Sequence, residues 1–233
     1  MSARARQLVL LGVLALLVIV KVQQPGSLFA VTATAETFPK DVVVTAAPTT
    51  NIYGDRAELR VLQLVDSMNA MWAGAFTAAG DEYERPRVES AEGRPAEGCG
   101  STEEGWAGVY CPRDRAIVID VGHQQVRRAI VGEEGADALL GYVLAHEIGH
   151  HVQTLRGNRH VGAPEDVLRG ELHAECLAGV WGRAAGHPPP PAWTYASDAA
   201  HGTAAQQRHW LERGHARGRP GDCDALWTAP LTR

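Results

Sequence analysis

One stretch of the sequence decides the fold: HEIGHHVQ, at residues 146–153. It lies late in a segment, residues 137–156, whose apolar spacing predicts a single helix. Four residues of helix turn through about 400°, so His146 and His150 project from one face and can hold the same metal ion. Glu147 lies beside them, where its carboxylate can accept a proton from a water on the metal. The stretch therefore predicts a metal site built on a helix.

Two histidines are too few for a catalytic zinc site, which usually has three protein ligands and one open position. Glu171 is the preferred third ligand, because it follows His150 by 21 residues on the next predicted helix, and an antiparallel return brings it level with the motif. Glu175, one turn later, can accept a hydrogen bond from the second ring nitrogen of a ligand histidine. His160 and His173 are rival ligands, and an exposed acidic pair is the alternative interpretation of the two glutamates.

Length and composition limit the class of protein. The chain has 233 residues, of which 45% are hydrophobic, enough for one core with an appendage. The net charge is −5, and the sequence contains no run of Lys or Arg that could form a basic face. We therefore expect no nucleic-acid partner.

The N-terminus predicts export from the cytoplasm. Arg4 and Arg6 precede an unbroken apolar run of 13 residues, residues 8–20. The run is short for a membrane span, which needs ~20 residues, but neutral neighbours bring it near the lower limit. We favour an uncleaved membrane anchor over residues 1–24, and a secretory signal cleaved near residues 33–35 is the alternative. Either way the remainder lies outside the cytoplasm, as a single-pass protein of the cell membrane or as a secreted one.

The four cysteines contain no C-x-x-C pair, which argues against a structural zinc knuckle and leaves two disulfides or four thiols. Outside the cytoplasm, disulfides are the usual state of cysteine pairs. We therefore expect the bonds Cys99–Cys111 and Cys176–Cys223.

Beyond the N-terminal segment the chain divides into two parts. Residues 25–50 are rich in Thr, Ala, Val and Pro without helical period, which predicts an extended linker. The folded domain is predicted over residues 51–233. Its first element is a long helix that begins near Asp55 with a capping box and ends at Gly80.

A small sheet is predicted between this helix and the motif helix. Short strands are expected near residues 87–89, 108–111 and, most clearly, 116–121. Two helices follow the motif: residues 165–185, ended by a run of four prolines, and a last helix that begins after Thr203. The predicted fold class is α+β, mainly helical, with a small β-sheet before the motif helix.

Several blocks, in the same order along the chain, resemble a known family. They are YCPRDRAIVID at residues 110–120, HEIGHHVQ at residues 146–153, ELHAECLAGVWG at residues 171–182 and HGTAAQ at residues 201–206. Together they resemble the bacterial “putative neutral zinc metallopeptidase” family over about residues 51–224. The resemblance implies a zincin-like fold whose third metal ligand is a glutamate.

By this resemblance His146, His150 and Glu171 are ligands of Zn²⁺, and Glu147 is the general base. The implied function is a zinc metallopeptidase that hydrolyses peptide bonds of a peptide or protein substrate through a metal-activated water. His201 precedes a helix start in a block that the resemblance marks, so it is our candidate to donate a hydrogen bond to the oxyanion.

Alternatives remain open for this last residue and for the function. Tyr195 is a second candidate for the oxyanion donor, and His201 can equally be a loop histidine that bonds only local backbone. The alternative function is a membrane-tethered module that binds zinc without hydrolysing peptides. It is motivated by Glu175, where the family usually has Asp, and by the short segment before His201.

Overall fold

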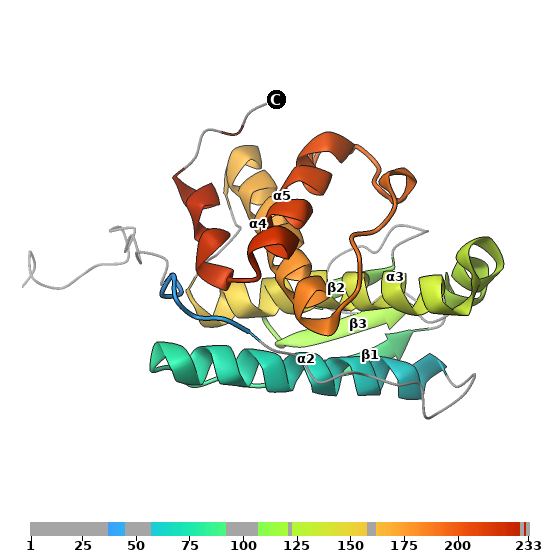
Figure 1. Cartoon of the computed structure of the whole chain (residues 1–233), viewed down its shortest axis with the longest axis horizontal. Coiled ribbons are helices and arrows are strands. Elements are labelled where there is room, and N and C mark those ends of the chain that lie inside the picture. Colours follow the sequence, from blue (N-terminus) through green and yellow to red (C-terminus); the bar gives the residue numbers. More distant parts are fainter. Residues whose placement is uncertain are drawn as a thin grey trace, which may run out of the picture. The chain divides into compact units, whose positions relative to one another are not determined.

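The motif lies on α3 (His123–Leu155), the longest helix in the described part of the chain (Figure 1). Gly132 interrupts this helix with φ 75° and ψ 176°, so the motif helix proper starts directly after it. The start predicted at residue 137 was late, because only the glycine leaves the helical conformation and the residues after it continue the helix. The computed structural model describes residues 37–44, 57–91, 107–120, 123–157, 162–228 and 231.

The predicted sheet is present and has three strands. They are β1 (Arg87–Ala91), β2 (Gly108–Cys111) and β3 (Ala116–Asp120), in the order β1-β3-β2. β3 pairs with β1 in parallel and with β2 antiparallel. As the central strand, β3 is buried along its whole length, which explains its unbroken β-branched run. The α+β class is therefore confirmed.

The helix α2 (Ala57–Ala79) lies along the sheet side of α3 (Figure 1). Its predicted apolar stripe is buried, including Met68, Trp72 and Phe76. The helix ends at Gly80, whose φ of 83° is a left-handed conformation that favours glycine. The stripe packs into the core, and no chemistry is assigned to it.

On its other side, α3 packs against α4 (Pro164–Ala185), which packs in turn against α5 (Ala204–Arg217) (Figure 1). Two glycines allow the backbones of α4 and α5 to approach closely. A Cβ at Gly179 would lie 2.0 Å from the carbonyl oxygen of Leu211, and one at Gly214 would lie 1.9 Å from that of Cys176. Any larger residue would force these two helices apart.

Shorter elements complete the chain after α4. The 3-10 helix η1 (Ala192–Thr194) lies in the proline-rich connection to α5. The predicted capping box is present at Thr203, whose side chain accepts from the Gln206 backbone N–H while the Gln206 side chain returns the bond. Two further 3-10 turns, η2 (Pro220–Asp222) and η3 (Asp224–Trp227), follow α5.

Residues 37–44, which the sequence places in the linker, pack onto the core. The side chains of Phe38, Val42 and Val44 are buried. The guanidinium of Arg156, just after α3, lies 4.4 Å from the centre of the Phe38 ring and also bonds the carbonyl of Thr37. This segment is therefore attached to the end of the helix that carries the motif.

The predicted disulfide between Cys176 on α4 and Cys223 before η3 is confirmed. Both cysteines are fully buried. Cys111 at the end of β2 is also disulfide-bonded, and its predicted partner, Cys99, lies outside the described residues.

The predicted single-pass location in the cell membrane, with the N-terminal segment as the membrane partner, has to be corrected. Among the residues that the structure describes, no helix combines the length and the apolar character that crossing a bilayer requires. The predicted anchor, residues 1–24, lies outside those residues.

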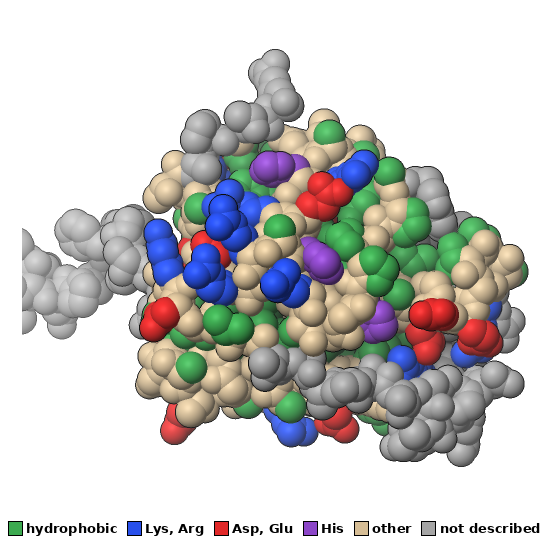
Figure 2. Space-filling model, viewed as in Figure 1, with side chains coloured by type: hydrophobic (Ala, Val, Ile, Leu, Met, Phe, Trp, Pro, Cys, Tyr) green, Lys and Arg blue, Asp and Glu red, His purple; other side chains and the backbone are tan. Residues whose placement is uncertain are grey.

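The surface in the described part of the chain mixes polar, charged and hydrophobic side chains, as the face in Figure 2 shows. The large hydrophobic side chains that stay exposed are Val43, Leu62 and Ile130. Val43 lies in residues 37–44, Leu62 on α2 and Ile130 on α3.

Candidate metal centre

Three side chains from α3 and α4 converge on one point. His146 Nε2 lies 3.1 Å from His150 Nε2, and Glu171 Oε2 lies 3.1 Å from the first and 3.2 Å from the second. Zinc bonded to tetrahedral ligands at 2.0–2.1 Å would place such atoms about 3.3 Å apart. The separations and the N, N, O donor set are compatible with a zinc ion, and the structure brings together the three side chains that the sequence singled out.

The approach of α4 to the motif depends on a glycine between the two histidines. A Cβ at Gly149 would lie 3.1 Å from the Cα of Ala174 and 3.3 Å from its carbonyl oxygen, tighter than ordinary contacts. The small residue lets α4 cross α3 close enough for Glu171 to reach both imidazoles. The motif thus contributes two of the three converging side chains and, at Gly149, the space that lets α4 approach.

Each of the two histidines has a polar group near its outer ring nitrogen. Glu175 Oε1 lies 3.4 Å from His146 Nδ1, as the sequence predicted, although no described residue gives this buried nitrogen a full hydrogen bond. His150 Nδ1 lies 3.0 Å from Oε1 of Gln153, a partner that the sequence did not predict. Such partners fix the ring orientation and leave Nε2 free for a metal.

Charge is concentrated in this cluster. Burial tends to lower the pKa of His146, but the carboxylates of Glu171 and Glu175 outweigh it and hold the pKa well above its usual value. Burial tends to raise the pKa of Glu171, but the neighbouring His150 and His146 outweigh this effect and hold the pKa well below its usual value. The three side chains therefore attract one another, and a bound cation would replace the protons that hold them together.

Glu147 lies against the beginning of β2. The side chain is only 7% exposed, and burial raises the pKa of its carboxyl despite the neighbouring His146 and His150. A Cβ at Gly108 would lie 3.2 Å from Cγ of Glu147 and 2.9 Å from Cδ1 of Ile119. The bare backbone of β2 therefore sets the position of this carboxylate.

His201 lies at the open side of the cluster. Its Nε2 is 3.4 Å from Glu171 Oε2, and its ring centre is 6.1 Å from that of His146. Asp198 holds the ring from the other side: one carboxylate oxygen accepts from the His201 backbone N–H at 2.7 Å, and the other lies 2.8 Å from Nδ1. The His201 side chain is 44% exposed, so solvent and a substrate can reach it.

Asp198 was not among the residues predicted from the sequence, although a local signal for it is present. Asp often accepts bonds from backbone N–H groups two or three residues later, and Asp198 does so from both Ala200 and His201. An Asp three residues before a candidate histidine, followed by Gly202 at φ 82°, is a pattern typical of such a turn.

The remaining candidates lie elsewhere. His173 is buried on α4 and contacts Gln153 and Asp224, and it does not join the three metal-site side chains. His160 lies outside the described residues. The Tyr195 hydroxyl is buried without a hydrogen bond from any described residue, and burial, with Glu175 nearby, raises its pKa.

The fold and the site together define an α+β protein in which two histidines of the motif helix α3 and a glutamate of α4 form a cluster compatible with zinc. A family model described as “Putative neutral zinc metallopeptidase” matches residues 6–188. The match covers more than half of the chain and includes all three converging side chains, so the chain belongs to this family. It ends before His201 and α5.

Several bacterial proteins are similar in sequence to this chain. “Uncharacterized protein YpfJ” of Escherichia coli is 28% identical over 197 residues, which are 66% of this chain and 66% of the relative. “Uncharacterized protein Mb2605” of Mycobacterium bovis and “Uncharacterized protein Rv2575” of Mycobacterium tuberculosis are each 28% identical over 221 residues, 75% of this chain and 72% of the relative. The chain thus spans 66% of the length of the first relative. No solved structure matches the chain.

Proposed function

We propose that this protein is a zinc-dependent metallopeptidase with a zincin-like arrangement, in which His146, His150 and Glu171 hold Zn²⁺. The observation that carries the proposal is the convergence of their three ligand atoms within 3.2 Å of one another, next to a buried glutamate. Three protein ligands leave one position open, as in catalytic rather than structural zinc sites. The substrate is then a peptide or a protein.

The bound zinc would supply Lewis-acid chemistry, lowering the pKa of a water to about 7 and polarising the peptide carbonyl. Glu147 follows His146 directly, and its buried carboxylate takes the proton of the attacking water and delivers it to the leaving amine. Because β2 packs against this side chain at Gly108, the carboxylate stays in one orientation while the proton moves.

His201 is the residue proposed to stabilise the oxyanion. Asp198 accepts from Nδ1–H and turns Nε2 toward the metal centre, and Nε2 donates to the oxyanion in the form of the ring that carries a proton on both nitrogens. A donor held by a second residue at the open side of the site needs no reorganisation when negative charge develops on the carbonyl oxygen. Asp198 is accordingly proposed as the residue that orients His201.

One observation favours a second candidate function. His201 Nε2 is 3.4 Å from Glu171 Oε2, so this histidine is close enough to become a fourth ligand after a small movement. Four protein ligands would close the site and make it structural. The protein would then bind zinc without hydrolysing peptides.

The experiment that separates the two functions is a peptide-library digest by the zinc-loaded full-length protein. We expect cleavage that a chelator abolishes and added zinc restores. His201→Ala should lower turnover while leaving the zinc dissociation constant within about twofold of wild type. A large loss of zinc affinity in His201→Ala, together with no cleavage by the wild type, would establish the closed site instead.

A further inference from the structure

The outer nitrogen of His150 leads into a chain of buried polar groups that the peptidase chemistry does not use. Nδ1 of His150 lies 3.0 Å from Oε1 of Gln153, one turn later on α3. Gln153 is fully buried. A buried amide is a costly group, so its two ends must both be satisfied, and the way it is turned decides what it offers to His150.

The carbonyl of Gly170 fixes the orientation of this amide. It can only accept, and it lies 2.8 Å from Nε2 of Gln153. The amide nitrogen therefore faces Gly170, and the amide oxygen faces His150. Because that oxygen can only accept, Nδ1 of His150 must carry its proton, and the lone pair of Nε2 is left for the metal. Gln153 thus selects the tautomer of His150 that binds zinc.

A second histidine and a carboxylate continue the chain. Nε2 of Gln153 also lies 3.1 Å from Nδ1 of His173, which must accept and so carries its proton on Nε2. That nitrogen is 3.3 Å from Oδ1 of Asp224. The other oxygen of Asp224 accepts from the backbone N–H of Phe38 at 3.0 Å. Both neighbours of this carboxylate are donors.

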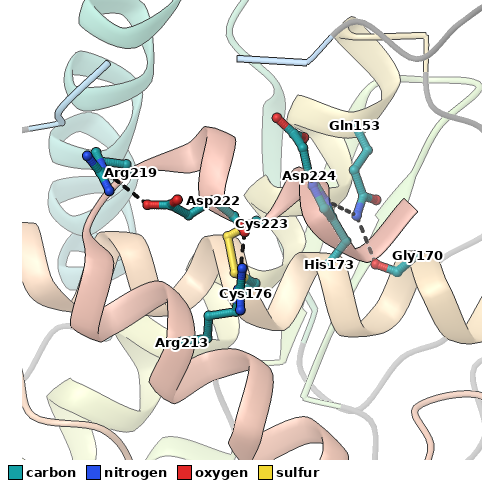
Figure 3. Close-up of a disulfide and its surroundings, with 9 residues drawn as sticks. All are labelled: Gln153, Gly170, His173, Cys176, Arg213, Arg219, Asp222, Cys223 and Asp224. Carbon is teal, nitrogen blue, oxygen red and sulfur yellow. Dashed lines mark hydrogen bonds and ion pairs between the residues drawn. A yellow bond between two sulfur atoms is a disulfide. The ribbon is translucent and has the colours of Figure 1, made fainter. Parts of the chain in front are cut away.

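Asp224 is brought to this position by the C-terminal segment. Figure 3 shows His173 between Gln153 and Asp224, beside the disulfide of Cys176 with Cys223. The bond attaches the residue before Asp224 to α4, directly after Glu175. The disulfide therefore ties together the chain positions next to both carboxylates that serve the ligand histidines.

We propose that Asp224 is a positioning residue of the zinc site: through His173 and Gln153 it holds His150 in the tautomer and orientation that bind the metal. The inference rests on the proposed zinc site and extends it to a segment of the chain that follows α5. At each step along these contacts a donor faces an acceptor, so Asp224 has to accept from both Phe38 and His173.

The substitution Asp224→Asn tests whether both acceptor oxygens are needed, with almost no change in the shape of the side chain. An amide presents one acceptor and one donor group, whereas the site offers two donors, the Phe38 N–H and the His173 Nε2–H. If the amide oxygen keeps the Phe38 bond, the amide nitrogen opposes His173 and favours its other tautomer. Nδ1 of His173 then carries a proton that opposes Gln153, and the orientation of Gln153 is lost.

The measurement is the zinc dissociation constant of the full-length protein, by competition with a chromophoric chelator. Loss of an outer partner of a metal ligand usually weakens binding 10- to 100-fold, and we expect about 10-fold for Asp224→Asn because it acts through two other residues. Asp222→Asn is the matched control: that carboxylate pairs with Arg219 and has no link to His173, so zinc affinity should not change. Circular dichroism of each metal-free variant shows whether it is folded.

A double-mutant cycle distinguishes positioning from general weakening of the fold. Because Asp224 acts through Gln153, Asp224→Asn should change zinc affinity little in a Gln153→Ala background. Gln153→Met, which keeps the volume, replaces the alanine variant if that variant does not fold. An unchanged affinity in Asp224→Asn, or the same loss in both backgrounds, would overturn the positioning role. A wild-type protein that binds no zinc would overturn the metal site itself, and that result precedes any comparison of variants.

Discussion

Removal of the Cys176–Cys223 disulfide should lower the free energy of unfolding by an amount that depends on the length of the loop it closes. The two cysteines are 47 residues apart in sequence, and both are fully buried. The chain-entropy model gives about 4 kcal/mol for a crosslink that closes a loop of this length. Over Ala35–Arg233 the entropy of unfolding near Tm is about 0.4 kcal/mol/K, so Tm should fall by about 10 °C.

The assay is thermal unfolding of the double variant Cys176→Ala/Cys223→Ala, followed by circular dichroism in the presence of a chelator. Reductant provides the control: it should lower the Tm of wild type by more than that of the variant, in which only the disulfide of Cys111 remains to be reduced. A variant that unfolds within about 2 °C of wild type would show that the disulfide does not restrict the unfolded chain as its loop length requires.

Three further predictions follow from the site and its surroundings. Gly108→Ala should press on Ile119 and Glu147 and lower kcat several-fold while zinc content stays at the wild-type level; equal kcat would show that β2 does not position the base. Asp198→Asn should lower kcat about 10-fold with KM little changed, because the orientation of His201 is lost, and a change confined to KM would contradict this role. Burial, with Arg60 nearby, lowers the pKa of His187 from 6.5, so the unfolded state binds protons more readily and stability is lost as pH falls below about 6.5. The Tm of His187→Gln, measured in chelator, should therefore rise relative to that of wild type as the pH falls from about 7 to about 5. A difference in Tm that does not depend on pH would contradict this prediction.

Local patterns in the sequence were enough to predict the elements that carry the site. Helical spacing placed His146 and His150 on one face, and a proline at the first position together with a glycine past the end delimited α4. The capping box at Thr203 predicted the start of α5. Such signals work because they act within one turn of helix, where no other part of the chain is needed.

The approach of Glu171 to the two histidines was a less local prediction and depended on the crossing of two helices. The sequence supported it through spacing and through resemblance, and the structure adds Gly149 as the reason why α4 comes close enough. From the sequence alone, a glycine in the middle of a helix is expected to destabilise that helix. Here its missing side chain is what the packing requires.

The parts that the sequence did not predict all depend on contacts between distant segments. Phe38 lies in a stretch without periodicity, and its burial requires Arg156 from the end of α3 and Asp224 from the C-terminal segment. The bond between Gln153 and His173 likewise exists only after α3 and α4 have packed. No local propensity encodes these partners, so only the folded structure identifies them.

Glu147 is proposed as the base of a zinc centre held by His146, His150 and Glu171, and zinc content measured together with peptide hydrolysis tests this role. Zinc content and peptide hydrolysis should be determined for wild type, Glu147→Gln and His146→Ala, each as full-length protein. We predict one zinc per chain in Glu147→Gln with hydrolysis reduced by about 10²- to 10⁴-fold, and loss of both zinc and hydrolysis in His146→Ala. If Glu147→Gln cleaved peptides as fast as wild type, Glu147 would not be the general base.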